Sequence, residues 1–217
     1  MWRQAELTVE RGKRVSVKAE LEALHRQIAA CTRCILHQSR VKAVPGAGPP
    51  DAHILFIGEA PGFHENQQGL PFVGAAGKFL DELLEQIDMR REEVFITNVV
   101  KCRPPGNRDP EPDEIEACRP YLDRQIELIR PKMIITLGRF SMARYFTNAK
   151  ISHIHGQPRK VEGVICYPMY HPAAALHQPS LRRTVEDDIL KIPDLLAQID
   201  DLADSKPPEQ AEQLSLF

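Results

Sequence analysis

The most restrictive feature of the sequence is a set of four short apolar runs separated by longer amphipathic segments. The runs are HILFIGE (53–59), VFITNVV (94–100), MIITLG (133–138) and VICYPMYHP (164–172). Each has the length of a strand and is apolar at almost every position, as strands covered on both faces are. This alternation predicts an α/β fold in which a mostly parallel sheet lies between layers of helices.

The segments around these strands carry apolar residues at helical spacing. In 77–87, for example, Phe79, Leu80, Leu83 and Leu84 fall on one face. Asp113 is the N-cap that we expect for the helix beginning near Pro112. Helices are predicted over the following segments: 18–31, 77–87, 112–129, 139–146 (a short one) and 184–199.

The length of 217 residues suits one domain with its own core. We expect this domain over 17–200, after a flexible basic N-terminus (1–16) and before a disordered, acidic, Pro-rich tail (201–217). Residues 1–48 carry nine Lys/Arg against four Asp/Glu, which suits phosphate contacts or a solvated helix face. The sequence has no run of about 18 apolar residues and no apolar signal region at its N-terminus. A cytoplasmic protein is therefore expected.

Four of the five cysteines are spaced like metal ligands. Cys31 and Cys34 form a CxxC pair, and Cys102 and Cys118 lie at the edges of a predicted strand and helix. Four thiolates suit zinc and an iron–sulfur cluster equally well, and unliganded thiols are the alternative. Cys166 lies inside an apolar run and is predicted to be a core residue.

Polar side chains follow three of the predicted strands, where ligands bind in parallel sheets. Asn98 can offer a donor and an acceptor to a base edge, and His171 can donate to a carbonyl oxygen. Glu59 and Glu65 bracket the Gly-rich turn after the first strand, and Phe72 is expected beside the same pocket. Each glutamate taken alone also suits a loop or capping role.

Basic residues gather on two predicted loops. Short basic loops around a cleft can hold a phosphodiester backbone, and solvated loop charge is an equally good explanation. The loop KCRPPGNRDP carries Lys101, Arg103 and Arg108, and a later segment carries Leu181, Arg182 and Arg183.

Taken together, the motifs GEAPG, GLPFVGAAG, TNVVKCRPPGNRDPEPDEIEAC and YHPAA resemble those of family 4 uracil-DNA glycosylases, the iron–sulfur type of bacteria and archaea. The resemblance covers about residues 25–198 in order. It implies a three-layer α/β/α sandwich with a central four-stranded, mostly parallel sheet. It also implies one structural [4Fe-4S] cluster, held by Cys31, Cys34, Cys102 and Cys118.

The resemblance also implies roles in excising uracil from double- or single-stranded DNA. Phe72 matches the residue that stacks on the flipped uracil, Asn98 the one that reads its amide edge, and His171 the one that contacts its O2 atom. Glu59 and Glu65 match acidic positions of the uracil and water site, and either can handle the water.

Two positions depart from the family pattern. Ala60, in the expected uracil site, stands where the best-known uracil glycosylases have an aspartate that activates water, so the partner of the water must lie elsewhere. Asn66 stands where many relatives have a second acidic residue. No lysine lies within the core motifs of the expected uracil site, so we expect a monofunctional enzyme that leaves an abasic site. We also expect the enzyme to be a monomer.

Two other functions fit parts of the sequence. One is a relative that stays covalently attached to the abasic sugar, but its basic insert, KRRIH, is missing from the continuous KCRPPGNRDP run. The other is a zinc-stabilised nucleic-acid-binding module without catalysis.

The chain ends in QLSLF, an apolar segment after a polar tail. Bacterial sliding clamps bind short segments of the form Q-L-S/D-L-F, and the match predicts that this enzyme is bacterial and binds such a clamp, near the nucleoid. Tethering would raise its concentration at replicating DNA. A chance match, or an end that folds back on the domain, is the alternative. The predicted contact residues are Gln213, Leu214, Ser215, Leu216 and Phe217.

Overall fold

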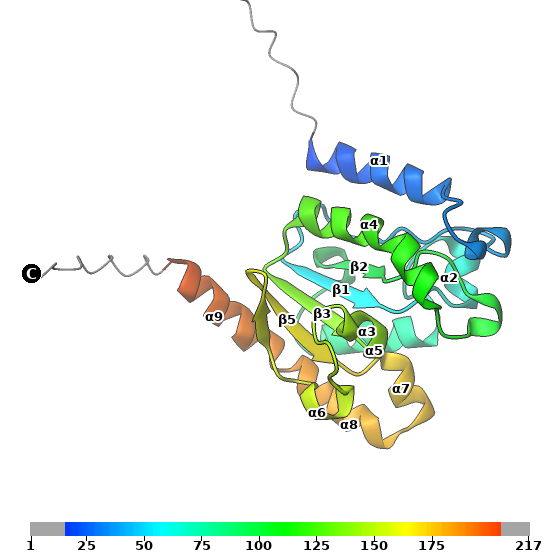
Figure 1. Ribbon diagram of the computed structural model, residues 1–217. Coiled ribbons are helices and arrows are strands. Elements are labelled where there is room, and N and C mark those ends of the chain that lie inside the picture. Colours follow the sequence, from blue (N-terminus) through cyan, green and yellow to red (C-terminus); the bar gives the residue numbers. More distant parts are fainter. Residues whose placement is uncertain (1–15, 205–217) are drawn as a thin grey trace, which may run out of the picture.

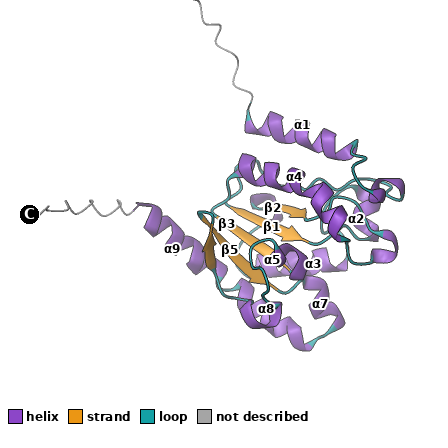
Figure 2. Cartoon of the chain, viewed as in Figure 1, coloured by secondary structure: helices purple, strands orange, loops and turns teal. Residues whose placement is uncertain are grey.

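A five-stranded sheet forms the centre of the protein, shown as a computed structural model that describes residues 16–204 (Figures 1 and 2). The strand order is β2-β1-β3-β5-β4, and the first four of these are parallel. The predicted α/β fold is confirmed. The strands are β1 (Ile54–Gly58), β2 (Phe95–Asn98), β3 (Met133–Leu137), β4 (Arg159–Val161) and β5 (Val164–Met169).

The fifth strand, β4, was not predicted. It pairs antiparallel with β5 at the edge of the sheet. Its three residues are mostly exposed, so they carry no apolar signal. Glu162 and Gly163 connect the two strands with φ angles of 51° and 89°, the backbone of a tight hairpin turn. The turn, rather than hydrophobicity, therefore specifies this strand.

Helices cover both faces of the sheet (Figure 1). The described helices are α1 (Val17–Ala29), α2 (Phe63–Gln68), α3 (Ala75–Glu85), α4 (Pro112–Ile129), α5 (Arg139–Ala143), α6 (Ile151–Ile154), α7 (Pro172–His177), α8 (Ser180–Ile189) and α9 (Ile192–Asp204). Short 3-10 helices lie at Ile35–Gln38, Arg91–Glu93 and Pro105–Asn107. None of the helices within residues 16–204 has the length and apolar character needed to cross a membrane.

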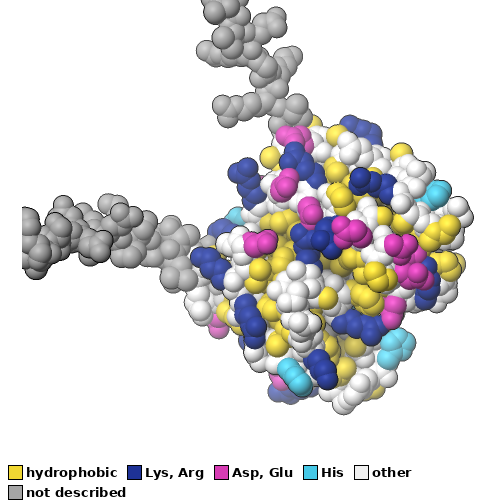
Figure 3. All heavy atoms as spheres, in the orientation of Figure 1, with side chains coloured by type: hydrophobic (Ala, Val, Ile, Leu, Met, Phe, Trp, Pro, Cys, Tyr) yellow, Lys and Arg dark blue, Asp and Glu magenta, His cyan; other side chains and the backbone are white. Residues whose placement is uncertain are grey.

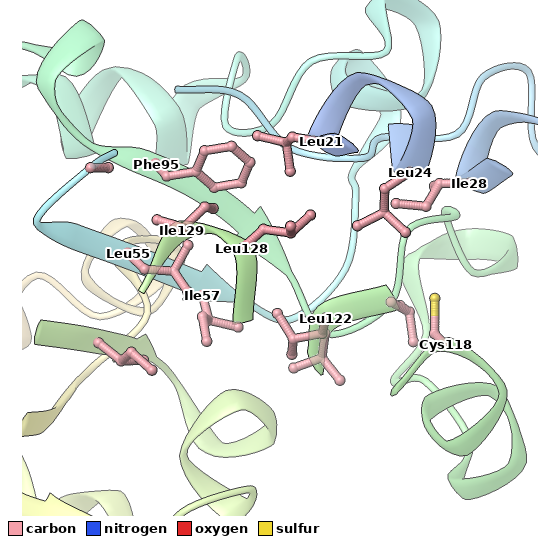
Figure 4. Close-up of a cluster of buried hydrophobic side chains, with 14 of the residues drawn as sticks. Leu21, Leu24, Ile28, Leu55, Ile57, Phe95, Cys118, Leu122, Leu128 and Ile129 are labelled. Carbon is pink, nitrogen blue, oxygen red and sulfur yellow. The ribbon is translucent and has the colours of Figure 1, made fainter. Parts of the chain in front are cut away.

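The two faces of β1 belong to separate hydrophobic clusters. Leu55 and Ile57 pack with α1 and α4, whereas Ile54 and Phe56 pack with α3 and α8. This alternation follows from the two-residue period of a strand. Figure 4 shows the first cluster, with Cys118 at the end near Ile28 of α1. The thiol of Cys118 thus lies where α1, α4 and the sheet meet.

Three details of the predicted helices are wrong. The segment 184–199 is two helices, because Pro193 cannot donate to the backbone of a continuous helix and so falls in the first turn of α9. The helix α9 also runs to Asp204, beyond the predicted helix end at 199. The N-cap of α4 is Glu111 rather than Asp113, because Pro112 starts the helix and Glu114 Oε2 accepts from the Glu111 N–H at 2.8 Å.

Candidate active site

A cavity of about 410 Å³ lies at the carboxyl ends of the central strands. Its walls come from the loops after β1, β2 and β5, which are far apart in sequence. The cavity brings together all six residues that were predicted as catalytic or substrate-binding from three separate motifs. They are Glu59, Ala60, Glu65, Phe72, Asn98 and His171.

Phe72 is held in one wall by its unusual backbone. Its φ angle is 51°, a left-handed conformation that is rare for a bulky side chain and indicates a constrained position. Gly77 permits it, because a Cβ on Gly77 would overlap the Phe72 backbone. The ring stacks on His171 with a centroid separation of 5.4 Å and an interplanar angle of 23°. The two stacked rings therefore lie side by side in the wall of the cavity, nearly parallel to each other.

Asn98 presents an unsatisfied acceptor to the cavity. It is the last residue of β2 and only 1% exposed, and its Oδ1 atom has no hydrogen-bond partner among the described residues. A buried carbonyl without a donor costs about 1–3 kcal/mol, so this atom is suited to an N–H of a bound planar ligand. Gly58 leaves room for it, because a Cβ there would overlap Asn98 Oδ1 and the Phe72 ring.

His171 is fixed in one tautomer by the helix that it caps. The Ala173 backbone N–H donates to His171 Nδ1 at 3.1 Å, so the proton of a neutral ring lies on Nε2. Burial lowers the pKa of His171 to about 4, and the nearby Glu65 only partly opposes this. At neutral pH the side chain is thus an uncharged Nε2–H donor.

Glu65 is occupied by the backbone of its own loop. Its Oε1 atom accepts from the Val73 and Gly74 N–H groups, both at 2.8 Å, and Oε2 accepts from the Gly62 N–H at 3.1 Å. These bonds tie α2 to the segment that carries Phe72. Glu65 therefore shapes the cavity.

Glu59 is in a different situation from Glu65. It directly follows β1 and lines the same cavity. Burial raises the pKa of its carboxyl group, the nearby Asp109 adds to this, and Arg139 opposes it. A carboxylate with a raised pKa is a stronger base than an ordinary one.

The sequence did not identify some lining residues. His177 lies at the exposed end of α7 and lines the cavity, as do Pro104 and Asn107. An isolated histidine three residues after the motif YHPAA carries no separate sequence signal, and only the course of α7 places it. No lysine is among the residues that line the cavity within the described chain.

The four predicted metal ligands line a second cavity, between α1, α4 and the loop after β2. These residues are Cys31, Cys34, Cys102 and Cys118. Cys166 lies elsewhere, fully buried in β5, and its predicted core position is confirmed. Within residues 16–204 no three His, Cys, Asp or Glu side chains form the compact set of a single-ion site.

The surroundings of these sulfur atoms suit a negatively charged metal–thiolate group. Arg40 Nη1 donates to Cys102 Sγ at 3.2 Å, and the Lys101 backbone N–H donates to Cys118 Sγ at 3.3 Å. Such N–H···S hydrogen bonds tune iron–sulfur centres. Burial raises the pKa of the Cys118 thiol to about 11, and a bound metal is what turns such thiols into thiolates.

Lys101 contradicts its predicted position on an exposed basic loop. Its side chain is 1% exposed and points into the protein. The ammonium group donates to Thr97 Oγ1 at 2.6 Å, to the Asn98 carbonyl at 2.8 Å and to Gln125 Oε1 at 2.7 Å. Burial lowers the pKa of Lys101 to about 7.

The predicted DNA-contact residues fall into two groups. Arg108 lines the first cavity and donates two hydrogen bonds, of 2.6 and 2.9 Å, to the Glu114 carboxylate, and Arg103 lies on the same loop, five residues earlier. The second group lies on α8, where Leu181 packs against the core. There Arg182 pairs with Glu82 and Glu186, and Arg183 with Asp187. Basic and acidic side chains are interspersed over the face in Figure 3. The segment 213–217 lies outside the described residues.

The fold and the cavity together define an α/β protein with a candidate active site at the carboxyl ends of its parallel strands. The chain belongs to the uracil DNA glycosylase superfamily, whose family model matches residues 45–192. Within that superfamily it belongs to the type-4 branch, as its relatives indicate.

Three relatives, each a type-4 uracil-DNA glycosylase, match most of both chains. The protein of Sulfurisphaera tokodaii is 50% identical over 185 residues, covering 81% of this chain and 84% of the relative. That of Archaeoglobus fulgidus is 48% identical, with 81% and 92% covered. That of Thermotoga maritima is 43% identical, with 79% and 92% covered.

Proposed function

We propose that this protein hydrolyses the N-glycosidic bond of deoxyuridine in DNA, releases uracil and leaves an abasic site for repair. One observation carries the proposal. The stacked pair Phe72 and His171 and the unpaired Oδ1 of Asn98 meet in one cavity at the strand ends. A planar ring with an N–H and a carbonyl oxygen on its edge matches these groups.

Recognition begins with extrusion of the nucleotide from the stack, which costs a few kcal/mol. The uracil ring then stacks against Phe72, and its N3–H donates to Asn98 Oδ1. The amide N–H of Asn98 would donate to uracil O4. Cytosine is excluded, because its amine and its unprotonated N3 present the reverse pattern.

In the chemical step a water oxygen bonds to the sugar C1′ as the bond from C1′ to uracil N1 breaks. The electron pair of that bond leaves with uracil as an anion. His171, held neutral, donates from Nε2 to uracil O2 and stabilises the developing charge. Glu59 takes the proton of the water, since Glu65 is occupied by three backbone N–H groups.

The absence of a lysine in the described lining supports a monofunctional reaction. An amine near C1′ would be needed to form a Schiff base with the abasic sugar. The described lining holds no such amine, which favours water as the nucleophile.

The four-cysteine cavity would hold one [4Fe-4S] cluster through Cys31, Cys34, Cys102 and Cys118. Such a cluster supplies bonds that fasten α1, α4 and the loop after β2 together; excision itself needs no electron transfer. The N–H donors of Arg40 and Lys101 to two of the sulfurs support a group with net negative charge there.

The terminal QLSLF supports a second proposal, that the enzyme binds the DNA polymerase sliding clamp of a bacterium. The polar sequence SKPPEQAE separates this motif from the domain. A clamp-bound enzyme would work on DNA in the cytoplasm, at the nucleoid.

The proposed function is tested by measuring uracil release from oligonucleotides with U·G, U·A or single-stranded U. Matched oligonucleotides with cytosine or thymine in place of uracil are the controls. Release of uracil alone is the expected result, and release from none of the three substrates by folded, metal-loaded protein would contradict it. A denaturing gel of the same reactions should show no protein–DNA adduct, which the covalent relatives would form.

A further inference from the structure

Phe63 is an aromatic side chain that the fold leaves exposed. It is 52% exposed, and no other Phe, Tyr or Trp within residues 16–204 is classed as exposed. Exposing a large aromatic ring forgoes the hydrophobic stabilisation of burying it. Phe63 is the first residue of α2 and follows Gly62, which lines the first cavity. The ring therefore lies beside the mouth of that cavity.

A cation is held over this ring. The Arg103 guanidinium lies 5.3 Å from the centroid of the Phe63 ring. The His64 ring packs edge-on against the same Phe63 ring, with 5.5 Å between the two ring centroids. Arg103 is itself fixed, because its Nε–H donates to Asn107 Oδ1 at 2.7 Å. Asn107 lines the first cavity as well. Phe63 and Arg103 are thus anchored to opposite loops, after β1 and after β2, that both border the cavity.

Of the two arginines on this loop, Arg103 is the one whose charge is less neutralised by neighbouring carboxylates. The Arg108 guanidinium is neutralised by Glu114 through two hydrogen bonds. Arg103, by contrast, contacts an amide oxygen and an aromatic face, and no ion pair to it is recorded among the described residues. Its charge remains available to a phosphate, while its plane and the phenyl ring remain available for stacking.

An exposed aromatic ring beside an arginine is the arrangement with which proteins bind unpaired bases. When one nucleotide is flipped into the cavity, the bases on either side of it stay at the mouth. We propose that Phe63 and Arg103 form a stacking platform for one base that flanks the flipped uridine on the same strand. The platform binds that base when it is unpaired, and so favours single-stranded DNA. This inference rests on the proposed function.

The test is binding rather than excision. A single-stranded oligonucleotide carries 2′-deoxypseudouridine, a uridine whose carbon–carbon glycosidic bond cannot be hydrolysed. Two further oligonucleotides replace the base on its 5′ or its 3′ side with an abasic tetrahydrofuran. Fluorescence anisotropy gives the Kd of each for the wild type and for Phe63→Ala, Phe63→Leu and Phe63→Trp.

We expect the wild type to bind about tenfold less tightly when one of the two flanking bases is missing, as loss of one stacked base implies. Phe63→Ala and Phe63→Leu should bind the complete oligonucleotide about tenfold less tightly and be insensitive to that missing base. Phe63→Trp should behave as the wild type does. Leu190→Ala, which removes an equally exposed side chain outside the cavity lining, should change nothing.

Equal sensitivity of the wild type and Phe63→Ala to each missing base would overturn the platform. Uracil release from deoxyuridine is measured on the same proteins. A platform effect on binding without any uracil release would contradict the proposed function and leave the platform standing. Uracil release by the wild type, together with binding that no Phe63 substitution changes, would contradict the platform and leave the proposed function standing.

Discussion

The ammonium group of Lys101 donates a hydrogen bond of 2.8 Å to the backbone carbonyl of Asn98, the residue whose unpaired Oδ1 atom faces the active-site cavity. The same lysine contributes a backbone N–H to Cys118 Sγ. One residue therefore connects the four-cysteine site with the end of β2. The active-site cavity and the four-cysteine cavity are thus linked through the turn from Asn98 to Lys101.

Replacing the side chain of Lys101 should weaken both the fold and the active site, while its backbone N–H to Cys118 Sγ stays in place. Lys101→Met leaves Asn98 O, Thr97 Oγ1 and Gln125 Oε1 without their donor, and we expect the free energy of unfolding to fall by about 2–4 kcal/mol. We also expect a tenfold lower kcat/KM for uracil release. Urea unfolding and steady-state assays measure the two effects. Lys160→Met, an exchange of the same kind at an exposed lysine of β4 outside both sites, serves as the control.

His171 can be separated into its capping and donor functions. His171→Ala removes both the acceptor for the Ala173 N–H and the Nε2–H donor. His171→Asn keeps a side-chain acceptor suited to an N-cap, but its amide nitrogen ends one bond short of the Nε2 position and so cannot replace that donor. Both should lose about 100-fold in kcat, as expected when one donor to a developing charge is removed. Only the alanine variant should also lower Tm. Wild-type kcat in His171→Asn would contradict the donor role.

The pH dependence should follow Glu59. Because burial raises its pKa, Glu59 becomes protonated, and loses its function as a base, at a higher pH than an ordinary glutamate. The value of kcat should therefore fall as pH decreases, starting above the usual carboxylate range. His171, with a pKa of about 4, should give no step near pH 6.5. Glu59→Gln should be slow and lack the acidic limb, whereas an unchanged profile in this variant would assign the base to another group.

The cysteine site is tested by metal content. Cys102→Ser should lose iron, acid-labile sulfide and the brown colour of the protein, and should unfold at a lower temperature, because α1, α4 and the loop after β2 lose their common link. Cys166→Ala, at a buried cysteine outside the site, should keep its iron. Zinc without iron in the wild type would replace the cluster with a single-metal site.

The terminal segment should be needed for the clamp alone. Deleting 213–217 should leave uracil release from short oligonucleotides unchanged and abolish binding to a bacterial sliding clamp, measured by surface plasmon resonance. The double variant Leu216→Ala, Phe217→Ala should behave in the same way. Clamp affinity that survives the deletion would refute the motif.

The sequence predicted the parts of the fold that depend on hydrophobic period. The four parallel strands and α4 lie where the apolar pattern placed them, because burial on both faces leaves a clear signal. The exposed strand β4 left no such signal. The break between α8 and α9 was missed although Pro193 marks it.

The candidate site was predicted where side chains follow strand ends. The different roles of Glu59 and Glu65 within it were not predicted. That Glu65 is occupied by backbone N–H groups depends on how the Phe72 loop folds back onto α2, which no periodic pattern in the sequence shows. Lys101 was placed on the surface because charge usually is, and only the three acceptors around it explain its burial.

Gly58 shows how a pocket can be shaped by a missing atom. A Cβ added at Gly58 would occupy the space of Asn98 Oδ1 and the Phe72 ring, so any larger residue at this position would displace both. Much of the remaining lining is already minimal, with alanines at Ala60, Ala76, Ala173 and Ala174. Where these alanines line the cavity, the wall is nearly the backbone itself, so a bigger base could gain room only on the side lined by longer side chains such as Asn107 and His177.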